Sequence, residues 1–247
     1  MGRLDPAGDR AMSDAMRSAV ERAHAFRSAA RAFAPRADPE ALAADLAAWR
    51  ARSAGALEQT LAAACAALGA ANAQLAEQHE QLLGTRAGAV ACRETAYADA
   101  RRIAPTDLAD LAGFLCAFGV EPAHGPPDHV ATECELASLL SLKEAYALGE
   151  GWSERAEIAR TAYERLLGDH LARWLPRFAA RVVAAAPASF HAAAAAALAE
   201  LVSAEAVRIG IAVAHDGELA PDDDGDDDGA PVCGVASGCT LAGPRPA

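Results

Sequence analysis

The residues best suited to chemistry lie at the start of an apolar stretch, in segment 125–148. Asp128 and His129 follow two prolines, and Glu133 lies one helical turn after His129, on the same side of the expected helix. A carboxylate at a helix start accepts unpaired backbone N–H groups and complements the positive end of the helix dipole. A helix cap with an ordinary i,i+4 pair is one interpretation of these residues, and a polar binding site is the other.

The segment after Asp128 is apolar on every side of the helix that it is expected to form. One face carries Val130, Cys134, Ala137 and Leu148, and a second carries Leu136 and Leu140. The third face carries Leu139, Leu142 and Tyr146. A helix that is apolar all round is usually buried. The same stretch contains Glu133, Glu135 and Lys143, and buried charges need partners. We therefore expect this helix to cross the core and to have a polar site at one of its ends.

Catalytic and cofactor chemistry finds little support in the sequence. His129, Glu133 and His170 are possible zinc ligands, but the chain has neither an H-E-x-x-H nor a C-x-x-C pattern. It also lacks the G-x-S-x-G pattern of nucleophilic hydrolases, the P-loop and the G-x-G-x-x-G fingerprint. We expect a protein without catalytic residues, metal or cofactor, and a metal-dependent hydrolase on a helical scaffold is the alternative.

The elements that position these residues are expected to be helices throughout, because alanine is abundant and no segment alternates like a strand. The predicted helices cover 12–33, 39–53, 56–83, 105–119, 127–148, 153–167, 171–182 and 187–214. Gly69 is the expected bend in the third helix, and Pro176 is expected to kink its helix or to lie in the first turn. The predicted fold is all-α, with a single domain of roughly eight or more helices over 11–214. A disordered N-terminus (1–10) and an acidic, Gly/Pro-rich flexible tail (215–247) flank it.

Charge and cysteine usage narrow the class of protein. The formal net charge is −12, and eight acidic residues fall between His215 and Asp228, so no basic surface for nucleic acid is expected. Six cysteines, at positions 65, 92, 116, 134, 233 and 239, form no paired framework. This pattern favours a reducing cytoplasm. We expect neither an N-terminal signal segment nor a membrane span.

The acidic run 222–229 reproduces the first half of a calcium-binding loop. The twelfth position of that loop is Val235 rather than glutamate, and no helices are expected to flank it. A solvated acidic linker is therefore the favoured interpretation. Cys233 and Cys239 follow at a spacing that matches no standard metal site.

Four stretches of the chain resemble a known family. PDHVATECELASLLSLKEAYA, from Pro127, resembles the helix signature of TorD-type chaperones, the cytoplasmic maturation factors of molybdenum oxidoreductases. The stretches RETAYAD from Arg93, DLADLAGFLCAFGVEP from Asp107 and DHLARWLPRF from Asp169 resemble other family segments in the family's order, over about 92–180. The most similar subgroup is the delta-type chaperones of the dimethyl-sulfide, ethylbenzene, selenate and chlorate oxidoreductases. The chain departs from the family with Cys92-Arg93 in place of Pro-Tyr, and with Leu136-Ala137 in place of an aromatic residue and Met.

The resemblance implies a binding protein that holds the apo catalytic subunit of a molybdopterin oxidoreductase by its twin-arginine signal peptide, assists cofactor insertion and delays export. It implies a monomer or a domain-swapped dimer. The rival within this class is a helical adaptor that stays in the finished complex. Arginine pairs well with carboxylates, and the leader's apolar part needs a groove. The candidate partner-binding residues are the acids Glu94, Asp128, Glu133, Glu135 and Asp169, the histidines His129 and His170, and the groove residues Tyr97, Phe118, Leu136 and Trp174.

Overall fold

The computed structural model of the chain describes residues 12–71, 74–84, 89–97, 104–123 and 125–213, which belong to one compact unit. The predicted N-terminal segment 1–10 and tail 215–247 lie outside the described residues, as do the acidic run, Cys233 and Cys239. The domain boundaries therefore stay a prediction.

The described residues form helices and no strand, which confirms the predicted all-α class. The elements are α1 (Asp14–Ala32), α2 (Pro39–Arg50), α3 (Gly55–Ala71), α4 (Leu75–Leu83), the 3-10 turn η2 (Glu94–Tyr97), α5 (Ala104–Phe118), α6 (Val130–Gly149), α7 (Ser153–Leu166), the π turn η3 (Leu167–Leu171), α8 (Ala172–Ala185) and α9 (Phe190–Ile209). None of these helices is both long enough and apolar enough to cross a lipid bilayer.

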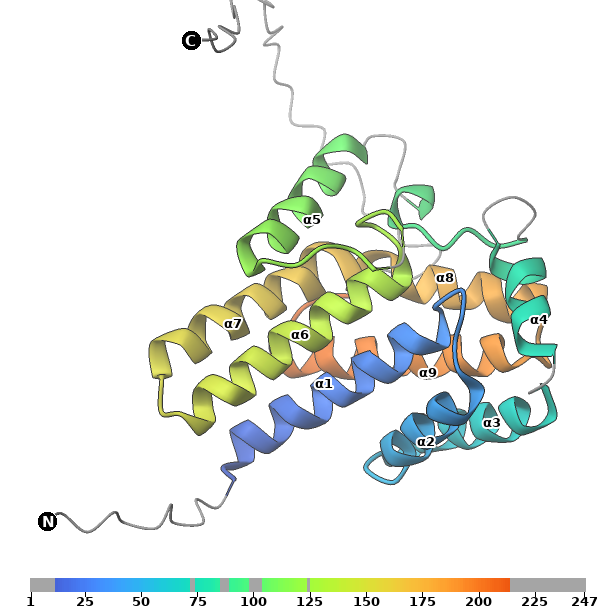
Figure 1. The fold of residues 1–247 in the computed structure, drawn as a ribbon, viewed down its shortest axis with the longest axis horizontal. Coiled ribbons are helices and arrows are strands. Elements are labelled where there is room, and N and C mark those ends of the chain that lie inside the picture. Colours follow the sequence, from blue (N-terminus) through green and yellow to red (C-terminus); the bar gives the residue numbers. More distant parts are fainter. Residues whose placement is uncertain (1–11, 72–73, 85–88, 98–103, 124, 214–247) are drawn as a thin grey trace, which may run out of the picture. The chain divides into compact units, whose positions relative to one another are not determined.

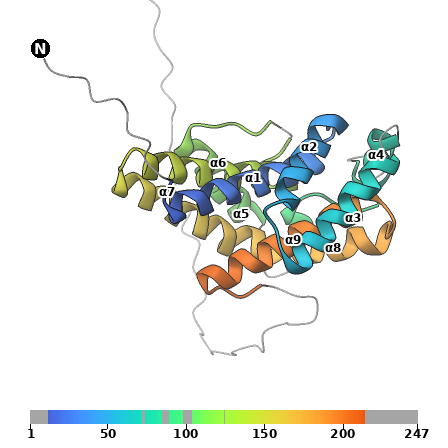
Figure 2. The ribbon, with the colours of Figure 1, turned by 90° about the horizontal axis from the view of Figure 1, so that it is seen from below.

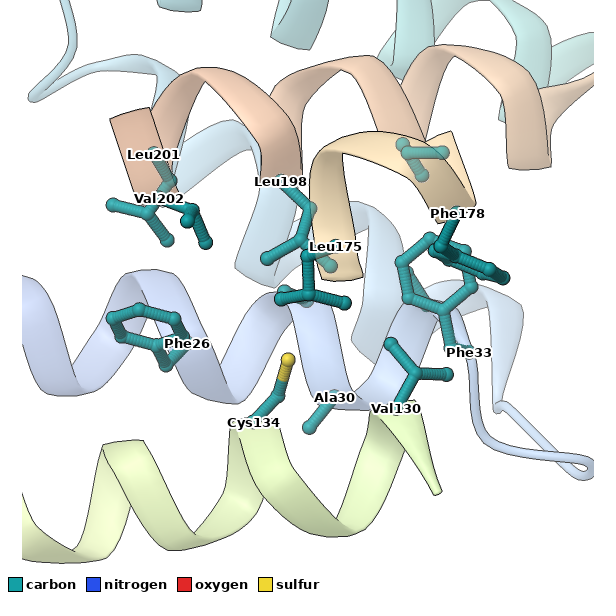
Figure 3. Packing of buried hydrophobic residues seen from close by; sticks show 14 of the residues in the cluster. Phe26, Ala30, Phe33, Val130, Cys134, Leu175, Phe178, Leu198, Leu201 and Val202 are labelled. Carbon is teal, nitrogen blue, oxygen red and sulfur yellow. The ribbon is translucent and has the colours of Figure 1, made fainter. Parts of the chain in front are cut away.

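The core lies where α1, α6, α8 and α9 meet. Helix α1 packs along α6, which also packs on α7, and α9 packs against α3 and α8 (Figures 1 and 2). Figure 3 shows how side chains from the four core helices come together. The labelled residues are Phe26 and Ala30 of α1 with Phe33 directly after it, Val130 and Cys134 of α6, Leu175 and Phe178 of α8, and Leu198, Leu201 and Val202 of α9, all of them buried. Asp38 caps the start of α2, since its side chain accepts a hydrogen bond from the Glu40 N–H at 3.0 Å.

Two predicted helices differ from the structure by more than a few residues at their ends. The single helix expected over 56–83 is two helices, α3 and α4, and Gly69 lies within α3 rather than at the break. The second part turns because its apolar residues Leu75, Leu82 and Leu83 are buried in the core, where His79 of α4 meets His191 of α9.

The expected helix start at Asp169 and His170 is also wrong. These residues lie in the π turn η3, inside a helical run that continues from α7 into α8. Pro176 lies within α8, shortly after this turn. Proline has no backbone N–H, so α8 lacks one of its regular helical hydrogen bonds at Pro176. The irregular turn η3 lies shortly before this position.

The cysteines of the described part are free thiols. Cys92 and Cys134 are buried, Cys65 is half-buried and Cys116 is exposed. Cys92 lies outside the helices, in the segment before η2. Burial raises the pKa of the Cys92 thiol to about 12, so this thiol is protonated and behaves as an apolar core group.

A pair of histidines lies buried between α4 and α9. The ring centroids of His79 and His191 are 5.4 Å apart, and Nδ1 of His191 has no hydrogen-bond partner among the described residues. Burial lowers the pKa of His191 to about 4, and His79 acts in the same direction. Burial also lowers the pKa of His79, against the opposing effect of Glu80. Both rings are therefore neutral in the folded protein near neutral pH.

We expect His191→Phe to remove part of the acid sensitivity of the fold. Since the folded pKa of His191 is depressed, the unfolded chain binds the proton first. The free energy of unfolding then falls as the pH drops from about 6.5 toward 4, by up to ~1.4 kcal/mol per pH unit. Urea unfolding across this range should show a shallower pH dependence for His191→Phe than for the wild type. His24→Gln, on the exposed side of α1, is the control, and equal slopes for His191→Phe and the wild type would contradict the assignment.

Candidate functional site

The segment 92–97 is held against the start of α6 by backbone hydrogen bonds. The N–H of Glu94 donates to the carbonyl of Asp128, and the N–H of Val130 donates to the carbonyl of Cys92, both at 2.9 Å. This isolated bridge between Arg93 and His129 joins two of the stretches in which the sequence places its site residues.

Asp128 is not the cap that the sequence predicts. The N-cap of α6 is His129, whose Nδ1 accepts from the Ala131 N–H at 3.2 Å. The carboxylate of Asp128 is fully buried and accepts instead from Arg93 Nε at 3.0 Å and from the Thr95 hydroxyl at 2.7 Å. Its partners lie 33 to 35 positions away in the sequence, so it fastens η2 to the start of α6.

His170 joins the π turn to η2 and α5. Its Nδ1 lies 2.8 Å from Oε2 of Glu94, and its Nε2 lies 3.2 Å from Oδ2 of Asp110. Burial acts to lower the pKa of His170, but the two carboxylates outweigh it and the pKa is raised. The imidazole is thus the polar link among three elements that are distant in sequence. Asp169, its neighbour, is exposed and lies 3.9 Å from Arg165.

Glu133, like Asp128, is a fully buried acid of the predicted set. Its Oε2 accepts from Trp174 Nε1 at 3.0 Å, and its Oε1 has no hydrogen-bond partner among the described residues. Burial, and then the nearby Glu94, raise the pKa of Glu133 well above its usual value. Tyr97 packs on Trp174, with ring centroids 5.3 Å apart, and donates from its hydroxyl to the Ala91 carbonyl.

All the predicted site residues but the exposed Asp169 fall into two groups. Most of them lie together but inside the protein, bonded to one another or to other groups of the same chain: Glu94, Tyr97, Asp128, His129, Glu133, His170 and Trp174. The expected open mouth lined by acids is not what the geometry shows at this end of α6. The half-buried Phe118 lines the groove beside α6 and α7, and the half-buried Glu135 with the buried Leu136 lines a hollow between α5 and α6. Whether any of these residues binds a partner stays a prediction.

A large apolar groove lies between α6 and α7, beside the end of α5. Its walls include Leu142, Tyr146, Trp152 and Ile158, which are 54%, 59%, 41% and 57% exposed. The expectation that every face of α6 is buried is therefore wrong for its third face. The groove has a volume of about 610 Å³, and we call it the α6–α7 groove; Phe118, Leu139, Lys143, Ala147, Arg155 and Ala159 complete its lining. Sequence reasoning missed Trp152 and Ile158, although their exposure beside Tyr146 makes one apolar patch.

Two smaller hollows adjoin this groove around α5, which lies beside α6 and α7 in Figure 1. One has a volume of about 560 Å³ and shares Phe118 and Ile158 with the groove. The other has a volume of about 190 Å³ and shares Leu139 with it. We call the latter the acidic hollow, because Glu121 and Glu135 are the charged residues that line it, with Leu115, Val120, Pro122, Thr132, Leu136 and Leu139.

Metal ligation has no support in the described part of the chain. No group of three or more His, Cys, Asp or Glu side chains is placed there to hold an ion. His129 and His170 each serve a structural bond of their own, the first in the cap of α6 and the second between Glu94 and Asp110.

The sequence matches a known family and a curated protein over part of its length. The family described as nitrate reductase delta subunit matches residues 44–180. A selenate reductase assembly chaperone protein of Thauera selenatis is 41% identical over 93 residues, which are 38% of this chain and 46% of that relative. The chain thus spans about half the length of this curated relative. No solved structure matches it. Because the family match covers more than half of the 247 residues, the chain belongs to the nitrate reductase delta subunit family of TorD-like chaperones.

Proposed function

We propose that this protein is an assembly chaperone for a molybdenum oxidoreductase, and that it binds the immature catalytic subunit through that subunit's twin-arginine leader. Membership of the family and the name of the relative support a non-enzymatic assembly chaperone. In this proposal the protein holds its client until the molybdopterin cofactor has been inserted, and it delays export. The proposed setting is the cytoplasm.

The observation that carries the leader-binding step is the exposed α6–α7 groove. Contiguous apolar patches on the surface of a folded protein mark binding sites, because a partner that covers them removes apolar area from water. A groove lined by leucine and aromatic side chains fits the apolar face of a helix. The adjoining acidic hollow offers the carboxylates that arginine side chains pair with best. A twin-arginine leader combines these two chemistries in one segment.

We expect Leu142→Glu to weaken leader binding by at least about 10-fold, or ~1.4 kcal/mol. The glutamate would place a charge among the apolar side chains of the groove, where a bound helix would exclude water. Titration calorimetry with a synthetic peptide that carries two arginines followed by an apolar helix-forming stretch measures the effect. Leu142 is more than half exposed, so the variant should keep its circular dichroism spectrum.

A matched control separates the groove from a general effect of added charge. Val207 lies on α9, is 79% exposed and does not line the groove, so Val207→Glu should bind the peptide like the wild type. Absence of heat with the wild type, or equal losses in the two variants, would overturn the proposal. A helical adaptor, unlike a chaperone, would also co-purify with the mature, cofactor-loaded enzyme.

A further inference from the structure

We propose that the α6–α7 groove binds its ligand in one direction. The basic end of the ligand lies at the acidic hollow, against Glu121 and Glu135, and the apolar part runs along α6 to Trp152. This inference rests on the proposed function, and it adds an orientation and two recognition residues, Glu121 and Glu135, to it.

The hollow and the groove form one continuous track along α6. Leu139 lines both of them. Glu135, Leu139, Leu142 and Tyr146 follow one another at intervals of three or four positions, so they lie along one side of the helix. At 1.5 Å per residue, the track from Glu135 to Tyr146 is about 16 Å long, which equals about three turns of a bound helix.

The charged side chains along this track differ in sign from one end to the other. Glu121 is exposed and Glu135 is half-buried at the acidic hollow. The charged residues that line the groove itself are Lys143 and Arg155. Their cationic groups lie over aromatic rings, Lys143 at 5.8 Å from the centroid of Phe118 and Arg155 at 4.5 Å from that of Trp152.

This difference in sign selects the orientation of a ligand with a basic end. An arginine pair at the hollow meets two carboxylates, whereas the reversed ligand would bring its arginines to Arg155 and leave Glu121 and Glu135 facing apolar side chains. Complementary charges set register and orientation more than they set total affinity, and like charges brought together reject the wrong arrangement. The bound segment therefore runs in the same direction as α6 when its arginines precede its apolar stretch.

Trp152 can report the orientation directly, since Trp49 and Trp174, the other tryptophans, are buried. The synthetic twin-arginine peptide is labelled with a nitroxide quencher either before the arginines or after the apolar stretch. We expect the label after the apolar stretch to quench the fluorescence more strongly, and we expect Trp152→Phe to abolish the difference between the two peptides. Stronger quenching from the arginine end, or equal quenching from both ends, would overturn the orientation and leave the proposed function intact. A peptide that does not bind at all would overturn the proposed function, and the orientation with it.

A charge variant tests the two recognition residues independently. The double variant Glu121→Gln, Glu135→Gln should bind the twin-arginine peptide about 10-fold more weakly, while its affinity for a peptide with glutamines in place of the arginines stays unchanged. Glu40→Gln combined with Glu77→Gln makes the same change in net charge at exposed positions on α2 and α4, and it should leave both affinities unchanged. An equal loss for the two peptides, or no loss for either, would contradict the role of Glu121 and Glu135.

Discussion

Replacing Arg22 by alanine is expected to lower the free energy of unfolding by about 3–5 kcal/mol, because it breaks a buried charge network and leaves Glu144 without its paired cation. Arg22 of α1 is buried and donates from Nε to the Ser141 hydroxyl at 2.9 Å. Its guanidinium pairs with Glu144 of α6 and lies 3.9 Å from Glu205 of α9. It also lies over the ring of Tyr163, at 4.4 Å from the centroid.

The size of the effect follows from the cost of burying Glu144. Burial raises the pKa of Glu144, and the opposing effect of Arg22 reduces this shift without cancelling it. Without Arg22 the carboxyl group must either take up a proton or stay charged with only the weaker effects of Arg160 and Arg208 to offset its burial, and both outcomes cost stability. Arg208 still pairs with Glu205 in the variant, so the loss is concentrated at Glu144.

Urea unfolding followed by circular dichroism measures the loss in Arg22→Ala. Arg17→Ala is the matched control on the same helix, since Arg17 is exposed and its nearest acid, Asp14, is 3.9 Å away on the surface. Exposed pairs contribute about 0–1 kcal/mol, so the control should change little. A loss below about 1 kcal/mol in Arg22→Ala would mean that the network contributes no more than a surface pair.

Local signals in the sequence were enough to predict most helices. Asp38 with Pro39 marks the start of α2, and the periodic apolar residues of α1, α5, α7 and α9 give helices close to the predicted limits. The break between α3 and α4 and the π turn before Pro176 are different. They depend on which distant helix each apolar side chain meets, and single-sequence periodicity carries no such information.

For the same reason, only part of the candidate site could be predicted from the sequence. Family-like stretches identified Glu94, Glu133, His170 and Trp174, and the structure does bring these residues together. Their burial could not be predicted, because the partners that neutralise them are remote in sequence: Glu94 and His170 are 76 positions apart. The exposed face of α6 was assigned to the core because its apolar composition alone does not distinguish a buried face from a binding surface.

The second large effect on stability concerns the protonation state of the buried Glu133 carboxyl group. Burial raises the pKa of this carboxyl well above its usual value, and the nearby Glu94 raises it further. The hydrogen bond from Trp174 Nε1 favours the charged form but does not outweigh the other two effects. Since the folded protein binds a proton that the unfolded chain has already lost, the free energy of unfolding falls as the pH rises above about 4.5, by up to ~1.4 kcal/mol per pH unit.

Glu133→Gln should therefore stabilise the protein, and more so as the pH rises toward the raised pKa of Glu133. Glutamine has nearly the shape of the protonated carboxyl, its carbonyl oxygen can accept from Trp174 Nε1, and it does not ionise. Unfolding curves of the variant and the wild type, measured from about pH 5 upward, should diverge with increasing pH. Glu135→Gln, two positions along α6 and half-buried, is the control and should run parallel to the wild type. If Glu133→Gln were destabilised at every pH, the carboxyl would have to be charged in the folded protein, and the charge of Glu133 rather than its proton would be what the fold requires.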